Sequence, residues 1–135
     1  MKKLLGASVL LASTTALANG ETVRVELNKL EPAGTACQAY IVIENSTEAA
    51  FDKLALDLVM FDPDGVIATR LAVEMGPLRA GRTSVKVFGI DAIPCDGLSR
   101  ILVNDVLACE SNGAARGDCL DLIETASRGS VELIN

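Results

Sequence analysis

The residues of this chain that could do chemistry are its four cysteines and its carboxylates, because the sequence contains no histidine. This absence removes the commonest general base, the commonest metal ligand, and the Ser-His-Asp and Cys-His arrangements. A carboxylate pair for glycoside chemistry could be drawn from five residues, but nothing in the sequence places two of them in one cleft. We interpret these residues as turn formers and solvated surface, and we expect no enzymatic activity and no cofactor. The five are Asp57, Asp62, Asp64, Glu74 and Asp91.

The cysteines are expected to form two disulfides, because the chain starts with an export signal and the compartment beyond the inner membrane is oxidising. A four-thiolate zinc site usually brings its ligands in close pairs, and a thioredoxin-type centre needs Cys-x-x-Cys. Neither spacing occurs here. Three pairings are possible, and we favour Cys37 with Cys95 and Cys109 with Cys119, since the last two are ten residues apart across a flexible stretch.

A tight turn is predicted at Asp62-Pro63-Asp64-Gly65. Proline presets φ at its position, the first aspartate can accept hydrogen bonds from the backbone ahead, and glycine tolerates positive φ. Asp62 and Asp64 also allow a calcium interpretation, since two carboxylates near a glycine bend suit a hard cation. The EF-hand pattern is not completed, because the twelfth position from Asp62 is Val73.

The first eighteen residues have the pattern of a secretory signal peptide. Lys2 and Lys3 precede a mostly apolar or small stretch, and Ala16 and Ala18 occupy the two positions that a signal peptidase reads, which predicts cleavage after Ala18. The apolar stretch of about fourteen residues is shorter than the roughly 20 that a membrane-spanning helix needs. We therefore expect a cleaved signal at 1–18, a single periplasmic domain at 19–135, and no membrane insertion after cleavage.

The mature chain is acidic, with 10 basic and 18 acidic residues once Lys2 and Lys3 are lost, a formal charge of −8. Nucleic acids and anionic lipid surfaces are negatively charged and would be repelled, so neither is an expected partner. Half of the residues are apolar, which argues against disorder.

Alternating apolar residues predict about seven strands separated by turn residues. The clearest is 54–60, where Leu54, Leu56, Leu58 and Met60 share one face while Asp57 interrupts the other. A short helix is expected after Asp118, with Leu120 and Ile123 on one side. The predicted strands are 22–27, 37–44, 54–60, 66–73, 83–88, 101–107 and 131–134, and the helix is 118–124.

This pattern predicts an all-β fold: an antiparallel immunoglobulin-like β-sandwich of about seven strands with one short C-terminal helix, stabilised by disulfides. A small closed barrel fits the same strand count and is the structural alternative. The tryptophan that packs on the disulfide of antibody domains is absent, as is every other tryptophan.

Several short motifs of the mature chain occur together, namely Cys37-Gln38-Ala39-Tyr40 leading to Glu44-Asn45, Val59-Met60-Phe61-Asp62 with Gly65, Leu78-Arg79-Ala80-Gly81-Arg82-Thr83, Pro94-Cys95, Asn104-Asp105-Val106 with Cys109 and Cys119, and Ala126-Ser127-Arg128. On these motifs the chain resembles a family of small exported alphaproteobacterial proteins of unknown function that are often labelled Tat-pathway signal proteins. The resemblance implies no catalytic residues. Lys2-Lys3 replaces the twin arginine of a Tat signal, and general secretion is the simpler route.

Two functions of different classes remain. The first is a non-enzymatic interaction module that binds an unidentified periplasmic protein or the periplasmic face of a membrane complex, with 66–73 or 131–134 as edge strands that accept a partner strand. The second is a small-ligand or divalent-cation binding protein that uses Asp62, Asp64 and their neighbours.

Overall fold

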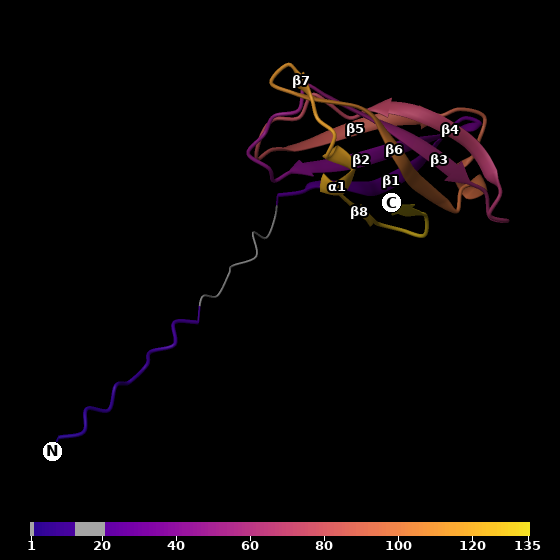
Figure 1. Ribbon diagram of the computed structural model, residues 1–135. Coiled ribbons are helices and arrows are strands. Elements are labelled where there is room, and N and C mark those ends of the chain that lie inside the picture. Colours follow the sequence, from indigo (N-terminus) through magenta and orange to yellow (C-terminus); the bar gives the residue numbers. More distant parts are fainter. Residues whose placement is uncertain (1, 13–20) are drawn as a thin grey trace.

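The computed structural model describes residues 2–12 and 21–135. Residues 2–12 form neither helix nor strand and point away from the folded domain (Figure 1), and the side chains of Leu4, Leu5 and Leu10 are more than 90% exposed. The predicted cleavage site at Ala18 lies outside the described residues. Within the described ranges, no helix combines the length and the apolar character that crossing a membrane requires.

The domain consists of two β-sheets. The first sheet has the strand order β5 (Thr83–Ile90), β2 (Ala36–Asn45), β1 (Val23–Ala33) and β8 (Ile123–Ser127). The second has the order β4 (Ile67–Glu74), β3 (Lys53–Phe61), β6 (Arg100–Ser111) and β7 (Ala114–Ala115), and β9 (Glu132–Ile134) also pairs with β6. The helical elements are a 3₁₀ turn, η1 (Cys95–Gly97), and one short helix, α1 (Cys119–Leu122).

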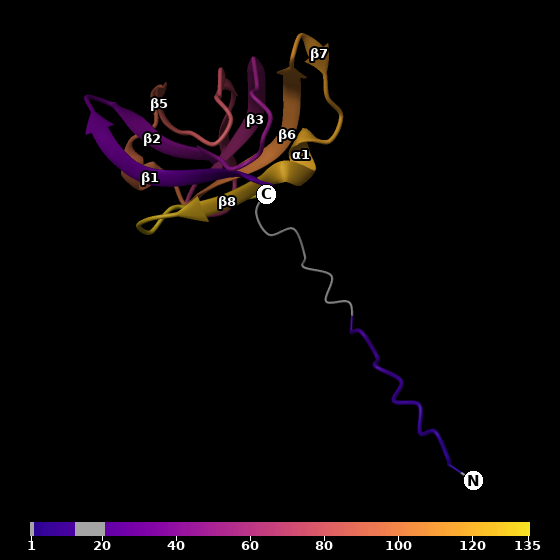
Figure 2. The same ribbon diagram turned by 90° about the vertical axis from the view of Figure 1, so that its left-hand side faces the viewer.

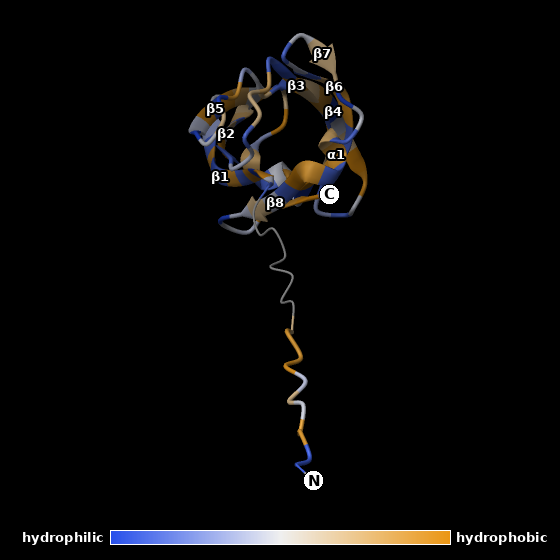
Figure 3. Cartoon of the chain, turned by 60° about the vertical axis from the view of Figure 1, so that its left-hand side comes forward, coloured by the Kyte–Doolittle hydropathy of each residue, from blue (hydrophilic) through white to orange (hydrophobic). Residues whose placement is uncertain are grey.

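The core lies between the sheets and is built from strands whose side chains alternate between two faces. Viewed end-on, the strands encircle this core (Figure 3). The four residues predicted to share one face of 54–60 are at most 1% exposed, and the same holds for the inward face of β2. Those buried residues are Leu54, Leu56, Leu58 and Met60 on β3, and Cys37, Ala39, Ile41 and Ile43 on β2.

The predicted strand count and the purely antiparallel pairing were wrong. The described residues form nine strands, and β8 runs parallel to β1 while β9 runs parallel to β6. After β6 the chain returns to the first sheet beside β1 and then crosses to the second sheet as β9 (Figures 1 and 2). Local sequence patterns do not reveal this crossing, because they carry no information on which strands become neighbours.

The predicted helix at 118–124 was too long. Helix α1 ends at Leu122, Ile123 is buried in β8, and Leu120 is 40% exposed. Pairing of Ile123 with Val23 of β1 outweighs the helical spacing of the apolar residues. Asp118 does not cap the helix through its side chain, which instead binds Arg116.

Strand β1 continues through Pro32 to Ala33, beyond the predicted strand at 22–27. Strand β8 pairs with β1 only as far as Leu27, so the rest of β1 has a neighbour on one side alone. A proline is tolerated in such an edge segment, because its missing N–H can face away from the paired neighbour.

Both favoured disulfides are present, which confirms the predicted pairing. Cys37 of β2 bonds to Cys95 in η1, which leads into β6, and thereby links the two sheets. Cys109 of β6 bonds to Cys119 at the start of α1. The strand order gives two separate sheets, so the closed-barrel alternative does not describe the connectivity.

Candidate functional site

One side of the sandwich ends in two edge strands, β4 and β5, whereas β8 and β9 connect the sheets on the other side. We call the side that carries β4 and β5 the open side. An edge strand has backbone N–H and C=O groups that no neighbouring strand uses, and such groups are a template for pairing with another chain. The predicted edge position of 66–73 is confirmed by β4.

The direction of the peptide groups of β4 follows from its register with β3. Leu54 accepts a 2.8 Å hydrogen bond from the Met75 N–H and donates its own N–H to Glu74 Oε1, so both peptide groups of Leu54 face β4. Peptide groups alternate in direction along an antiparallel pair. The residues of β4 bonded to β3 are Thr69, Leu71 and Val73, and those whose peptide groups face outward are Arg70 and Ala72.

The arginine of β4 is turned onto its own sheet. Arg70 donates from Nε and Nη2 to the two carboxylate oxygens of Asp57 at 2.7 and 2.6 Å, and Asn104 Nδ2 donates to Asp57 Oδ2 at 2.8 Å. The Asp57 side chain is 3% exposed on the outward face of β3, while that of Arg70 is 65% exposed. Arg70 is therefore occupied within the sheet and does not block the edge of β4.

Asp57 was predicted to lie on a solvated surface, and this was wrong. Arg70 and Asn104 bind the ionised carboxylate and lower the pKa of Asp57 from 3.8 to about 2. The sequence did contain a signal for this buried ion pair. It was an acid in the middle of an apolar strand, followed by an arginine on the strand after the turn. Their meeting depended on the hairpin register, which places Arg70 opposite Val59, two residue pairs away from Asp57 and on the same face of the sheet.

The acid of β4, Glu74, is likewise held within the domain. Its Oε1 accepts hydrogen bonds from the Leu54 N–H at 2.9 Å and the Gly76 N–H at 3.2 Å. The inward side chains of β4 carry no charge, since they are Thr69, Leu71 and Val73. The edge of β4 is thus uncharged, except for groups already bound to neighbours.

The other edge, β5, differs at its inward face. Lys86 lies opposite the buried Ile41 of β2 and therefore points toward the core side of its strand, where it is half-buried. A charged residue that points inward from an edge strand opposes the addition of another strand, because pairing would bury the charge. Val85 and Val87 lie on the outward face and are 64% and 39% exposed.

The second predicted edge, 131–134, is β9. It is three residues long and pairs with Arg100–Leu102 of β6. Leu133 and Val131 are buried, and the Leu133 N–H donates to Ser127 Oγ. This segment closes the sandwich, and it offers a much shorter template than the eight residues of β4.

A second buried acid, Glu26, lies on the outward face of the first sheet. Its carboxylate accepts hydrogen bonds from Asn28 at 2.9 Å, Arg24 at 3.0 Å and Arg128 at 3.1 Å. The hydrogen bond from Asn28 is the largest cause that lowers the pKa of Glu26, followed by Arg128 and Arg24. Because Arg128 follows β8, this contact fastens the end of β8 to β1.

The predicted turn at Asp62 is confirmed. Asp62 Oδ1 accepts hydrogen bonds from the N–H groups of Asp64 and Val66, both at 2.9 Å, and Gly65 has φ +78°. Within the described ranges, no group of three or more His, Cys, Asp or Glu side chains is arranged to hold a metal ion. The structure therefore places Asp62 and Asp64 in a turn whose first carboxylate is occupied by the backbone.

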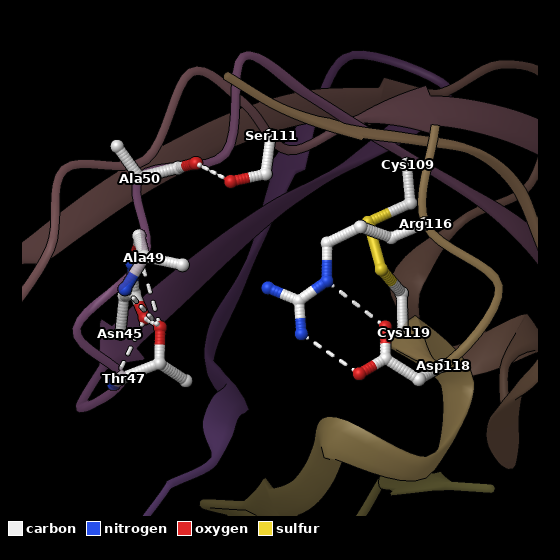
Figure 4. A network of polar contacts seen from close by, with 9 residues as sticks. All are labelled: Asn45, Thr47, Ala49, Ala50, Cys109, Ser111, Arg116, Asp118 and Cys119. Atoms are coloured by element: carbon white, nitrogen blue, oxygen red, sulfur yellow. Dashed lines mark hydrogen bonds and ion pairs between the residues drawn. A yellow bond between two sulfur atoms is a disulfide. The ribbon is translucent and has the colours of Figure 1, made fainter. Parts of the chain in front are cut away.

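Of the remaining predicted site residues, Asp91 is exposed, and Cys109 and Cys119 lie among polar contacts at one end of the domain (Figure 4). Beside the Cys109–Cys119 disulfide, Arg116 donates to both carboxylate oxygens of Asp118 at 2.9 and 2.7 Å. In the same region, Asn45 Nδ2 donates to the Ala49 carbonyl at 2.8 Å. These contacts fasten loops and do not form a nucleophile and base arrangement.

Comparison with known proteins shows a similarity of fold, but it does not assign the chain to a family. No family model and no curated protein matches the chain. Among solved structures, the chain is similar to one described as the structural characterization of IrmA from Escherichia coli, with a TM-score of 0.57 and 15% sequence identity. The similarity covers 77% of this chain and 90% of that chain. At this identity it establishes a shared fold alone.

Proposed function

We propose that this protein is an exported, non-enzymatic interaction module of the periplasm that binds a protein partner through the edge of β4. The partner is a periplasmic protein or the periplasmic face of a membrane complex. The observation that carries the proposal is the unblocked edge of β4, whose Arg70 and Glu74 are bound within the domain. Strand addition to such an edge supplies backbone hydrogen bonds for affinity and side-chain pockets for specificity.

Export is supported by two independent features. Residues 2–12 are exposed and take no part in the core, as expected for a segment that is removed. The two disulfides are consistent with an oxidising compartment. The resemblance to small exported alphaproteobacterial proteins remains a prediction that agrees with both features.

An immunoglobulin-like arrangement is the finer description of the fold that we propose. Strands β2 and β5 pair in one sheet while β3 and β6 pair in the other, as the B and E strands and the C and F strands do in immunoglobulin domains. The Cys37–Cys95 bond runs from β2 to the turn before β6, close to the positions that the conserved disulfide of antibody domains joins. Many domains of this architecture act by binding other proteins, an analogy about fold that does not by itself settle function.

The proposal is tested by substituting proline where the N–H faces outward. Ala72→Pro removes an outward donor of β4 and no hydrogen bond to β3. The tagged mature protein is expressed in its own host, the periplasm and membranes are cross-linked, and the captured proteins are quantified. We expect one protein or complex near stoichiometry with the wild type, and a loss of at least about tenfold with Ala72→Pro.

The matched control is Val85→Pro on β5. Asn45 donates its N–H to the Arg82 carbonyl, so by alternation the peptide groups of Val85 face outward from β5. Capture should survive this substitution. Equal capture by wild type and Ala72→Pro, with both proteins folded and disulfide-bonded, would contradict binding through β4.

A further inference from the structure

The open side of the sandwich carries a charge opposite to that of the rest of the protein. From Met75 to Ile90 the sequence has three basic residues and no acidic one, although acids outnumber bases 18 to 10 between residues 19 and 135. This stretch comprises the loop between β4 and β5 and all of β5. The three residues are Arg79, Arg82 and Lys86.

These three cations are available to a partner. Arg79 and Arg82 are exposed, and Lys86 is half-buried at the inward face of its edge strand. The ion pairs found in the described part of the chain involve none of the three. In contrast, Arg24, Arg70, Arg116 and Arg128 are each paired with a carboxylate of the domain.

The rim of the core is also incompletely covered at this side. Leu71 of β4 and Phe88 of β5 pack against the core but remain partly exposed, because neither strand has a neighbour beyond it. A strand added to β4 would place alternate side chains on the inward side, next to Leu71. Apolar residues at those positions would extend the core.

We propose that the β4 edge takes an extended, acidic segment of a partner protein, in which apolar residues alternate with glutamate or aspartate. This inference rests on the proposed function and specifies the partner's chemistry. The outward peptide groups of Arg70 and Ala72 pair with its backbone, and its apolar side chains cover Leu71. Arg79, Arg82 and Lys86 give the open side a local positive charge that attracts its carboxylates at a distance, and electrostatic complementarity of this kind sets specificity and association rate.

The test uses short fluorescein-labelled peptides that alternate valine with glutamate, with lysine or with threonine, and measures fluorescence anisotropy with the mature protein. We expect the glutamate peptide to bind about tenfold more tightly than the lysine peptide. Raising the salt concentration should weaken its binding, because the three cations are solvent-accessible. Ala72→Pro should abolish this binding, and Val85→Pro should leave it unchanged.

A variant that removes only charge completes the experiment. Arg79→Gln, Arg82→Gln and Lys86→Gln together should remove the preference for glutamate over lysine while weaker binding of the threonine peptide remains. Lysine-peptide binding that equals or exceeds glutamate-peptide binding would overturn the inference. So would binding of vesicles of anionic phospholipid that the triple variant loses and Ala72→Pro retains, since a lipid surface needs no strand pairing.

The two proposals fail in different ways. If the glutamate peptide does not bind but capture of the native partner still depends on Ala72, the inference about acidic chemistry is wrong and the β4 interaction stands. If capture of the native partner does not depend on Ala72, the proposed function is itself wrong.

Discussion

The two edge strands of the open side, β4 and β5, are of equal length and differ in how their charged residues are used. Lys86 points inward from β5 and has no ion pair in the described part of the chain. On β4, Arg70 and Glu74 are bound to Asp57 and to backbone N–H groups, and the inward face carries Thr69, Leu71 and Val73. From this comparison we expect a charge to protect an edge only where its side chain points toward the core side of the sheet and is not already bound to a neighbour.

The largest expected effect is the loss of stability on removal of the Cys37–Cys95 disulfide, which lies where β2 pairs with the end of β5. Cys37 lies opposite Ile90 of β5, and its bond to Cys95 closes a separation of 58 residues. On the chain-entropy model, replacing both cysteines by alanine should lower the free energy of unfolding by about 4 kcal/mol. The shorter Cys109–Cys119 link, with a separation of 10, should contribute about 3 kcal/mol.

Urea unfolding of the two double variants, followed by circular dichroism, measures this difference. β4 carries no cross-link of its own, so loss of Cys37–Cys95 should destabilise the β2–β5 pairing more than that of β3 with β4. A larger loss for Cys109→Ala/Cys119→Ala than for Cys37→Ala/Cys95→Ala would contradict the loop-length explanation.

Adding an inward lysine to β4 and removing the inward lysine of β5 tests the comparison most directly. Thr69→Lys places on β4 the inward lysine that β5 already has, because Thr69 lies opposite the buried Met60. We expect partner capture to fall by at least about tenfold, since strand addition would then bury the new charge. The measurement is quantitative capture from cross-linked periplasm.

The reciprocal variant, Lys86→Val, should make β5 available. Its expected result is self-association that rises with protein concentration, measured by analytical ultracentrifugation, because an unprotected apolar edge favours strand pairing. A monomeric Lys86→Val protein, together with unchanged capture by Thr69→Lys, would show that inward lysines do not distinguish the two edges.

The smallest effect is expected in the pH dependence of the β4 side. The pKa of Asp57 is lowered from 3.8 to about 2, so its ionised form stabilises the fold above pH 3.8. This contribution is lost as the pH falls through about 2, where the folded protein also takes up the proton. Asp57→Asn should therefore show a smaller decrease of melting temperature between pH 4 and pH 2 than the wild type.

The Asp57→Asn variant should retain part of the acid dependence through Glu26, whose pKa is also lowered, mainly by Asn28. Glu26→Gln serves as the matched control on the other sheet. Parallel melting curves for Asp57→Asn and the wild type over this pH range would show that Asp57 does not contribute to acid stability.

Much of the fold was predictable because it follows from local patterns. Alternation placed Leu54 to Met60 and Cys37 to Ile43 on buried faces, and the turn at Asp62 was predicted from its own residue types. The cysteine spacing and the predicted export signal together favoured the disulfide pairing that the structure contains. Each inference used only residues near one another in the sequence, or a constraint that the compartment imposes.

The candidate site was predictable only in part. The sequence pattern predicted the position of β4 as an edge strand, but it predicted 131–134 as an equal alternative, and in the structure three residues of that segment pair with β6. The burial of Asp57 depended on Arg70 and Asn104, which are 13 and 47 residues away in sequence. Contacts of this kind arise from strand register and sheet order, which local alternation does not encode.

By itself, the sequence determined that the chain is a β-rich domain with two cross-links, an acidic balance and no histidine chemistry. The tertiary structure decided which strands are edges, which way each peptide group faces, and which charges are already occupied. It did so because β8 and β9 close one side of the sandwich, while on the other side β4 and β5 each have a neighbouring strand along one edge only. Only that arrangement places Arg79, Arg82 and Lys86, which have no ion pair within the described part of the chain, on the open side.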